Sequence, residues 1–195
     1  MEEQEVEGQI IDEDATELDS EAQARRQLAL AQIRQYGDPV LRMRAGEVSS
    51  FNEDLQRLVT RMRQLMADAR GVGLAATQTG IVQRVFVFQK GEDDVVAVIN
   101  PMLTDLSEET EIDDEGCLSL QGVTAPVERH LRVTLEGKDP EEGQELRFEL
   151  EGHPARVAQH EIDHLDGVLI IDRTTDEARK AALATLRPKP ILASI

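Results

Sequence analysis

Two histidines and a glutamate with the spacing H-E-x-x-H lie within residues 159–167. On a helix, His160 and His164 are four residues apart, so they lie on one face, one turn above the other. Two neutral imidazoles at this spacing can bind one divalent metal ion. Glu161 lies beside them, where it can accept a proton from a water molecule that the metal activates. The pattern therefore predicts a metal-dependent hydrolytic site.

A third protein ligand is needed, because catalytic metal sites of this type usually have three protein ligands and a water molecule. The position at which a metzincin has its third histidine is occupied by Ile170, which argues against that class. A zincin that takes a glutamate from a later helix would use Glu177. The other candidate is Cys117, in a tight polar turn that we expect at the end of a strand. Its thiolate would be a soft ligand that accepts Fe(II), Zn, Co or Ni.

The two histidines need a helix to hold them. Pro154 suits the first turn of a helix, and Gly167 suits its end. Between them, an apolar face is formed by Ala155, Val157, Ala158, Ile162 and Leu165. Unpaired imidazoles on a buried helix would be costly, which favours metal binding over a solvated helix.

The other elements follow from hydrophobic spacing and residue type. We expect a helix over residues 21–35, a second helix that begins at a capping box of Ser50 and Glu53 and ends at Gly71, and a last helix over 176–186. The glycine-rich residues 71–78 favour a simple turn. Residues rich in β-branched and aromatic types predict strands over 81–88, 95–99, 101–106, 131–135 and 145–150. The fold class is therefore α+β, with antiparallel-rich β-sheets packed around a central metal-binding H-E-x-x-H helix.

The chain has 195 residues and a net charge of −18, which suits one domain and argues against binding to DNA through its phosphates. Residues 1–24 are acidic, contain no Lys or Arg, and are expected to form a disordered extension. Residues 25–173 would form the metallohydrolase domain, and residues 174–195 a C-terminal helix and tail. We find no membrane-length apolar run and no signal peptide, and the single cysteine fits a reducing compartment. A cytoplasmic protein without membrane contact is expected.

Three blocks of the sequence resemble the peptide deformylase family. They are GVGLAATQ at residues 71–78, EGCLS at 115–119 and QHEIDHLDG at 159–167, and YGDPVLR at 36–42 resembles the usual start of that family. The resemblance covers about residues 32–173. It implies a hydrolase that removes the formyl group from the N-terminal methionine of new bacterial proteins, with N-formylmethionyl peptides as substrates.

The resemblance also implies the metal ligands. Cys117, His160 and His164 would bind one divalent ion, with Fe(II) as the usual metal and Zn(II) or Ni(II) able to replace it. Two other functions stay open: a zincin-type metallopeptidase that uses Glu177 with the two histidines, and a catalytically altered deformylase-like protein that acts on another N-acyl amine. A non-catalytic binding relative is disfavoured, because the residues expected to do the chemistry are present.

The resemblance further implies catalytic roles. Glu161 would take a proton from the attacking water and return it to the leaving amine. The side-chain amide of Gln78 and the backbone N–H of Leu118 would donate to the formyl oxygen as negative charge develops on it. The substrate pocket would be formed by Val72, Gly73, Gly116 and Val157. Support for the ligands would come from Glu115, Gln159 and Asp163.

Three positions depart from the usual pattern of the family. His153 and Pro154 replace bulky apolar residues, which predicts a more polar methionine pocket. Thr124 stands where an arginine is common, which predicts weaker anchoring of the peptide beyond methionine.

The C-terminal segment from residue 173 is basic within an acidic chain. By resemblance it would either dock on the ribosome or pack on the domain as an amphipathic helix.

Overall fold

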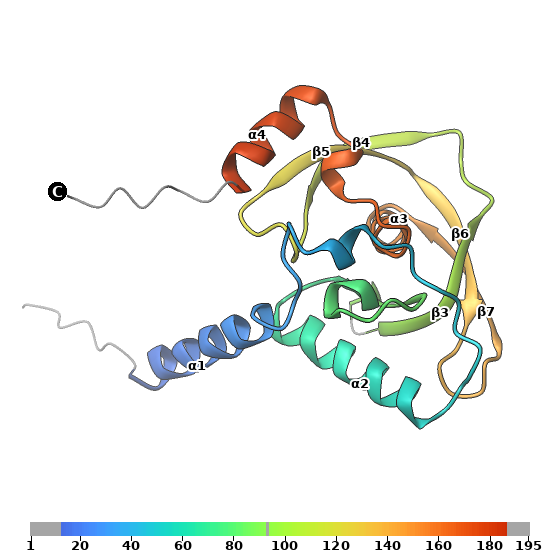
Figure 1. Cartoon of the computed structure of the whole chain (residues 1–195), viewed down its shortest axis with the longest axis horizontal. Coiled ribbons are helices and arrows are strands. Elements are labelled where there is room, and N and C mark those ends of the chain that lie inside the picture. Colours follow the sequence, from blue (N-terminus) through green and yellow to red (C-terminus); the bar gives the residue numbers. More distant parts are fainter. Residues whose placement is uncertain (1–12, 93, 187–195) are drawn as a thin grey trace, which may run out of the picture.

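The computed structural model describes residues 13–92 and 94–186, and Figure 1 shows their arrangement. Its helices are α1 (Glu13–Leu30), α2 (Glu53–Asp68), α3 (His153–Leu165) and α4 (Asp176–Leu186), with short 3-10 helices η1 (Pro39–Arg42), η2 (Ala76–Thr79) and η3 (Ile170–Asp172). Its strands are β1 (Gly73–Ala75), β2 (Val85–Gly91), β3 (Asp94–Thr104), β4 (Thr110–Gly116), β5 (Thr124–His130), β6 (Arg132–Lys138) and β7 (Glu145–Glu151). None of the described helices is both long enough and apolar enough to cross a membrane.

The strands form two antiparallel sheets. The larger sheet has the order β1-β2-β3-β6-β7, and the smaller sheet pairs β4 with β5. The expected α+β class with antiparallel sheets is therefore confirmed. The turn between β6 and β7 is built around Asp139, whose carboxylate accepts hydrogen bonds from the backbone N–H groups of Glu141 and Glu142 at 2.8 Å. This Asx-type turn joins two strands that the sequence predicts into a hairpin.

Both faces of the larger sheet are covered, which explains why β2 is apolar on both sides. Val85 and Val87 face the cluster that contains α2 and the end of α1, whereas Phe86 and Phe88 face the cluster that contains α3. α3 contacts β1, β2 and β7 of the larger sheet and β5 of the smaller one. Figure 1 looks nearly along its axis, with strands of the two sheets on different sides of it. The helix that carries the histidines is therefore held from several directions.

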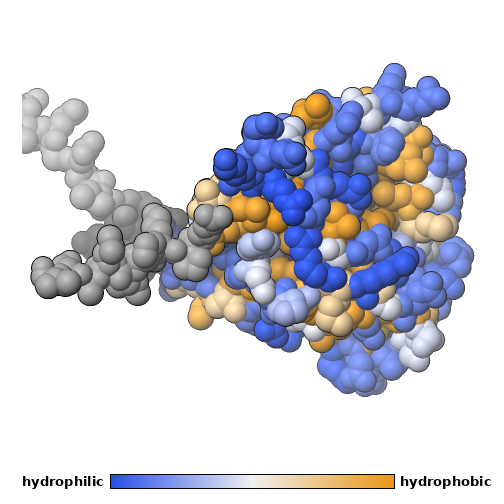
Figure 2. All heavy atoms as spheres, turned by 45° about the horizontal axis from the view of Figure 1, so that its top comes forward, coloured by the Kyte–Doolittle hydropathy of each residue, from blue (hydrophilic) through white to orange (hydrophobic). Residues whose placement is uncertain are grey.

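A third apolar cluster lies on the smaller sheet. Ala125 and Val127 of β5 pack with Ile170 of η3 and Ala182 of α4. α4 has the bounds that the sequence predicts. On the face shown in Figure 2, hydrophilic residues cover much of the described surface, with apolar residues in patches between them.

The first helix corrects one expectation. α1 begins at Glu13 rather than at residue 21 and ends at Leu30 rather than at residue 35, so residues 13–24 are helical instead of disordered. Good helix formers and acidic residues near the N-terminus, where the helix dipole favours them, account for the earlier start. The disorder expected for residues 1–12 lies outside the described residues. The domain boundary expected after residue 24 falls inside α1.

The start of the second helix also differs from the expectation. The side-chain oxygen of Asn52 accepts a hydrogen bond from the backbone N–H of Leu55 at 3.1 Å and caps α2. The expected capping box of Ser50 and Glu53 is therefore wrong, because Asn is an equally good cap and lies directly before the first turn.

β2 and β6 have shifted bounds, at Val85–Gly91 and Arg132–Lys138. Three larger differences from expectation concern the other strands. Residues 71–78 contain β1 and η2 instead of a simple turn. The strands expected over 95–99 and 101–106 form one strand, β3, whose pairing with β6 shifts register between Ile99 and Met102, around Pro101. The sequence did not predict β4 and β5, which the structure contains. β4 is rich in Asp and Glu, which are uncommon in strands, so its residues do not indicate one.

Candidate metal centre and active site

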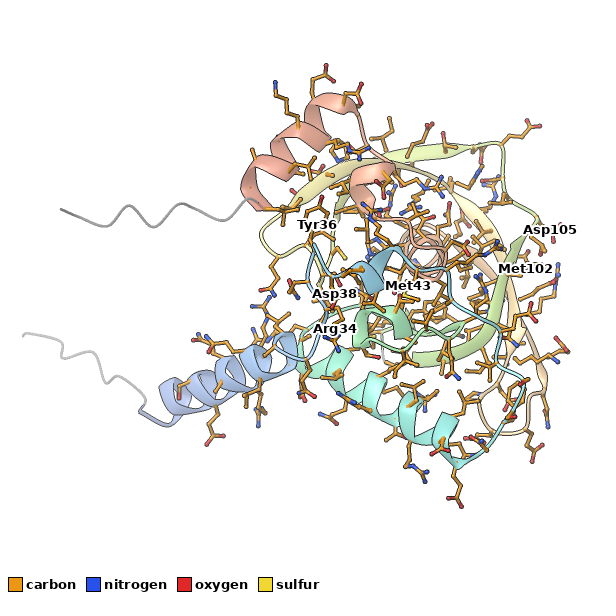
Figure 3. All side chains as sticks on the ribbon, in the orientation of Figure 1. Arg34, Tyr36, Asp38, Met43, Met102 and Asp105 are labelled. Carbon is orange, nitrogen blue, oxygen red and sulfur yellow. The ribbon has the colours of Figure 1, made fainter. Side chains whose placement is uncertain are left out.

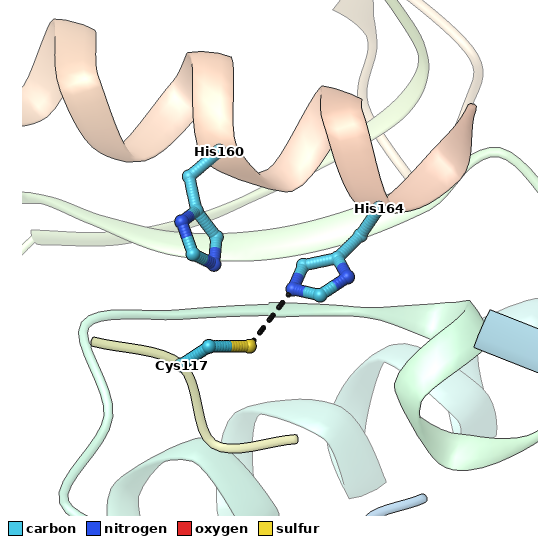
Figure 4. A group of neighbouring side chains, drawn as sticks. All are labelled: Cys117, His160 and His164. Carbon is cyan, nitrogen blue, oxygen red and sulfur yellow. Dashed lines mark hydrogen bonds between the residues drawn. The ribbon is translucent and has the colours of Figure 1, made fainter. Parts of the chain in front are cut away.

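One thiol and two imidazoles converge where β4 ends beside α3 (Figure 4). One ligand atom each from Cys117, His160 and His164 lies within 4.8 Å of the others. The Sγ atom of Cys117 is 3.2 Å from Nε2 of His164. Burial lowers the pKa of His164 well below its usual value, so this imidazole is neutral, as a metal ligand must be. A thiolate with two neutral imidazoles is a donor set that fits a transition-metal ion.

Glu115 orients one of the two imidazoles. Its Oε2 atom is 2.9 Å from Nδ1 of His160, which leaves Nε2 of that ring available to a metal. Burial alone would raise the pKa of Glu115, but hydrogen bonds from His160 and Arg129 hold it well below its usual range. Glu115 is therefore ionised, and the support predicted for it is present in the geometry.

Two arginines that the sequence reasoning did not assign complete this buried network. Arg129 on β5 donates to both oxygens of Glu115 at 2.9 and 3.0 Å and to Asp163 at 2.5 Å. Arg156 on α3 donates to Oε1 of Glu115 at 2.9 Å. One signal in the sequence points to Arg129: it continues the alternation of Ala125 and Val127, which are buried on the inner face of β5. A charged residue on a buried face requires a partner.

The other two supporting residues have different partners from those expected. Gln159 exchanges hydrogen bonds with the backbone of His130, at 3.1 and 2.8 Å, and so ties α3 to β5. Asp163 binds Arg129 and Arg173 rather than a histidine ring nitrogen. Both residues position the helix that carries the ligands, and neither contacts a ligand directly through a hydrogen bond described here.

Glu161 is buried beside the three candidate ligands. Glu161 is 3% exposed, and burial raises its pKa to about 7, although a charge on His160 would oppose that shift. Within the described residues its Oε2 atom has no hydrogen-bond partner. Gly73 allows the carboxylate to lie close to β1, because a Cβ at that position would overlap the carboxylate and lie 2.9 Å from Cγ1 of Val157. The carboxylate can therefore exchange a proton near neutral pH.

Gln78 and Leu118 line the pocket beside Cys117. Oε1 of Gln78 accepts a hydrogen bond from the backbone N–H of Ala75 at 2.8 Å, which turns its NH₂ group toward Ser119 Oγ, 3.1 Å away, and Cys117 Sγ, 3.8 Å away. Among the described residues, the backbone N–H of Leu118 has no hydrogen-bond partner. Two donors are thus available beside the candidate metal ligands.

The segment after α1 fixes both of these donors in place. The backbone N–H of Arg34 donates to the carbonyl of Gln78 at 2.7 Å, and that of Tyr36 donates to the carbonyl of Ser119 at 2.8 Å. The side-chain amide of Gln35 donates to the carbonyl of Leu118 at 3.1 Å. Figure 3 labels Arg34 and Tyr36 on this segment, which leads from α1 to η1. The sequence indicates a family resemblance at residues 36–42, but it does not predict this role.

The residues that are predicted to bind the substrate line one pocket with the candidate catalytic and metal-binding residues. Val72, Gly73, Gly116 and Val157 line the same pocket as Gln78, Cys117, Leu118, His160 and Glu161. His153 and Thr124, which depart from the usual family pattern, also line it. In the described part of the chain, the candidate metal-binding group contains Cys117 and not Glu177.

A family model described as polypeptide deformylase matches residues 30–180. The chain belongs to the polypeptide deformylase family. A peptide deformylase from Natranaerobius thermophilus is 44% identical over 153 residues, which cover 78% of this chain and 97% of that protein. One from Thermotoga neapolitana is 52% identical over 141 residues, which cover 72% of this chain and 85% of that protein.

Solved deformylase structures have the same fold. The crystal structure of peptide deformylase from Thermotoga maritima superposes with a TM-score of 0.71 at 48% identity and covers 73% of this chain and 96% of that chain. The enzyme from Thermus thermophilus gives a TM-score of 0.74 at 45% identity, with 79% and 91% covered. As a deformylase, the chain is a metal-dependent hydrolase that removes the N-formyl group from nascent peptides.

Proposed function

We propose that this deformylase holds one divalent ion with Cys117, His160 and His164, and that Fe(II) supports its activity, with Zn(II) or Ni(II) able to replace it. The observation that carries the proposal is the convergence of the three ligand atoms within 4.8 Å at the pocket that also contains Glu161. When bound, such an ion polarises a carbonyl oxygen and makes a water molecule acidic enough to ionise near neutral pH. A soft thiolate among the ligands suits these late transition metals.

In this proposal Glu161 moves the proton of the reaction. Its carboxylate accepts a proton from the water that attacks the formyl carbon and delivers it to the amine that leaves. Its burial and its unpaired Oε2 atom support this role, because no competing protein donor in the described chain occupies that oxygen. Glu161 therefore acts first as the general base and then as the general acid.

Gln78 and Leu118 are proposed to stabilise the developing negative charge on the formyl oxygen. The NH₂ group of Gln78 lies beside Cys117, and Leu118 follows Cys117 in the chain. Both residues are held by hydrogen bonds to Ala75 and Gln35, which do not line the pocket. Fixed donors aimed at such a charge typically contribute about 3 kcal/mol each.

The methionine side chain is proposed to occupy the part of the pocket lined by Val72, Gly73, Gly116 and Val157. Among the described strands, β1 pairs only with β2 and β4 only with β5, so each has an edge without a strand partner beside this pocket. An extended peptide could hydrogen-bond to such an edge, as peptides often do. His153 makes one part of the lining polar.

Replacing Gly73 by alanine is expected to lower kcat/KM for a formyl peptide by about 10- to 100-fold, because the new methyl group would displace the Glu161 carboxylate. Gly46→Ala is the matched control, since the nearest atom to a Cβ there is 3.9 Å away. Steady-state formate release measures both. Equal activity of the two variants would show that the close contact at Gly73 does not position Glu161.

The direct test is formate release from formyl-Met-Ala-Ser by protein loaded anaerobically with Fe(II), with acetyl-Met-Ala-Ser as the matched substrate. Rapid release of formate with little release of acetate is the expected result. If fully metal-loaded protein released no formate, the substrate would be another N-acyl amine. Variants at Thr124 and His153 would then be tested first, because these positions depart from the family pattern.

Replacing Cys117 by serine separates the proposed ligand set from one that includes Glu177. We expect Cys117→Ser to weaken metal binding at least about tenfold, the loss that follows even when only a ligand's orienting partner is removed. Glu177→Gln, on α4, should retain the metal. Metal content after gel filtration against a weak chelator measures both variants. The reverse pattern would support a zincin-type site.

We further propose that the enzyme acts on nascent chains in the cytoplasm and that its C-terminal segment docks on the ribosome. The segment's basic character supports docking, but α4 also packs Ala182 into the domain, so removing it would disturb the fold. Lys180→Glu changes an exposed charge instead. Ribosome co-sedimentation that is the same for this variant and the parent chain would argue against docking.

A further inference from the structure

We propose that α1 forms one wall of the active-site pocket, and that Arg26 on this helix, with Arg70, makes the enzyme favour substrates that carry a carboxylate shortly after the formylmethionine. The proposal rests on the proposed function. It concerns a helix that almost entirely precedes the segment matched by the deformylase family model, which begins at residue 30.

The end of α1 is part of the pocket and is held firmly there. Arg26 and Leu30 line the same pocket as Cys117 and Glu161. Ala29, one residue before Leu30, is 2% exposed within the cluster that α2 also enters. The Nε atom of Arg26 donates to the carbonyl of Ala69, just after α2, at 3.4 Å. Figure 1 shows the end of α1 meeting the end of α2.

Arg70 adds a second positive charge to this wall. It follows Ala69 in a left-handed conformation, with φ of 58°, and also lines the pocket. Both side chains are exposed, and within residues 13–92 and 94–186 neither forms an ion pair with a carboxylate. Two arginines without carboxylate partners in the described part of the chain therefore line the pocket, one near the end of α1 and one just after α2.

Acidic residues also line the pocket. Asp113 and Asp114 of β4 are among its lining residues, but the carboxylate of Asp113 accepts a hydrogen bond from the backbone N–H of Asp114 at 2.8 Å. A peptide whose formyl end lies at Glu161 would therefore extend through a pocket lined by both arginines and aspartates. The long, forked guanidinium groups can reach a substrate carboxylate with two parallel hydrogen bonds, whereas the short aspartates have less reach and one is engaged. The α1 wall therefore sets the preference.

The test uses amidated tetrapeptides of the form formyl-Met-Ala-Ala-Ala, with a single Glu, Gln or Lys at residue 2, 3 or 4. The quantity compared is the ratio of kcat/KM for the Glu peptide to that for the Gln peptide at the same position. In the parent enzyme we expect this ratio to be about two to five at one position at least, as for an exposed ion pair. The difference should lie in KM, because the contact is remote from the reacting atoms, and it should decrease at high ionic strength.

Arg26→Glu and Arg70→Glu should each bring the ratio to one or below, and Lys should then be preferred to Gln. Arg25→Glu is the matched control: Arg25 is the adjacent exposed arginine on α1 and does not line the pocket, so its ratio should stay that of the parent. Because the ratio compares two peptides on one variant, partial loss of active protein cancels.

An unchanged ratio in both Arg26→Glu and Arg70→Glu would overturn the inference, and so would a preference of the parent enzyme for Lys peptides. In either case hydrolysis of the Gln peptides would leave the proposed function intact. Absence of hydrolysis of every formyl peptide by metal-loaded enzyme would instead overturn the proposed function, and the inference with it.

Discussion

Replacing Glu161 by glutamine is expected to lower kcat for formyl-peptide hydrolysis by about 10³-fold, with the metal still bound. Glutamine has nearly the same shape, so it fits beside Gly73, but it cannot accept a proton. The nearby ligand atoms of Cys117 and His160 do not depend on this carboxylate for a hydrogen bond described here. Formate release under anaerobic conditions measures the loss.

The metal content of Glu161→Gln must be measured beside its activity, because an empty site would also be inactive. Glu177→Gln serves again as the control, since it removes one carboxylate from an exposed position on α4. A loss of less than about tenfold with the metal fully bound would mean that some other group carries the proton, and the proposed role would be wrong.

Replacing Arg129 by methionine is expected to lower the free energy of unfolding by about 3 kcal/mol, near the lower end of the range for breaking a buried ion pair. The arginine side chain is 5% exposed and bridges Glu115 and Asp163. Its removal leaves two buried carboxylates with fewer partners, although Arg156 and Arg173 remain. Urea unfolding of the metal-loaded variant measures the change.

Arg147→Met is the matched control for this prediction. Arg147 also bridges two carboxylates, those of Glu136 and Asp105, but its side chain is 53% exposed. Water screens such a pair, so we expect a much smaller change in stability. Equal destabilisation by the two substitutions would show that burial of the Arg129 network does not determine its contribution.

Short, local patterns made the candidate site predictable. Residues 159–167 contain two candidate ligands and a carboxylate whose relative positions follow from helical geometry alone. Cys117 lies far from them in the sequence, and the residues alone left Glu177 as a competitor; the resemblance to a family favoured Cys117, and the structure brings its Sγ to the histidines. The roles of these residues remain proposals that the variants above test.

Contacts between distant elements were not predictable in the same way. Arg129 lies on β5, a strand that the sequence did not indicate, and its partners come from β4 and α3. The start of α1 was misplaced, because an acidic composition typical of disorder also suits the first turns of a helix. The first error concerns a residue whose state depends on contacts between distant elements, whereas the second concerns a local composition that suits both a disordered segment and a helix.

The origin of the proposed ligands on two separate parts of the fold has a thermodynamic consequence. Cys117 follows a strand of the small sheet, whereas both histidines belong to α3. An unfolded chain does not hold these atoms together, so an ion that they bind favours the folded state by linkage, with about 2.7 kcal/mol gained at a free metal concentration 100 times Kd. The melting temperature of this enzyme then depends on the free metal concentration of the buffer as well as on the chain. A chelator should lower the melting temperature, as a denaturant does.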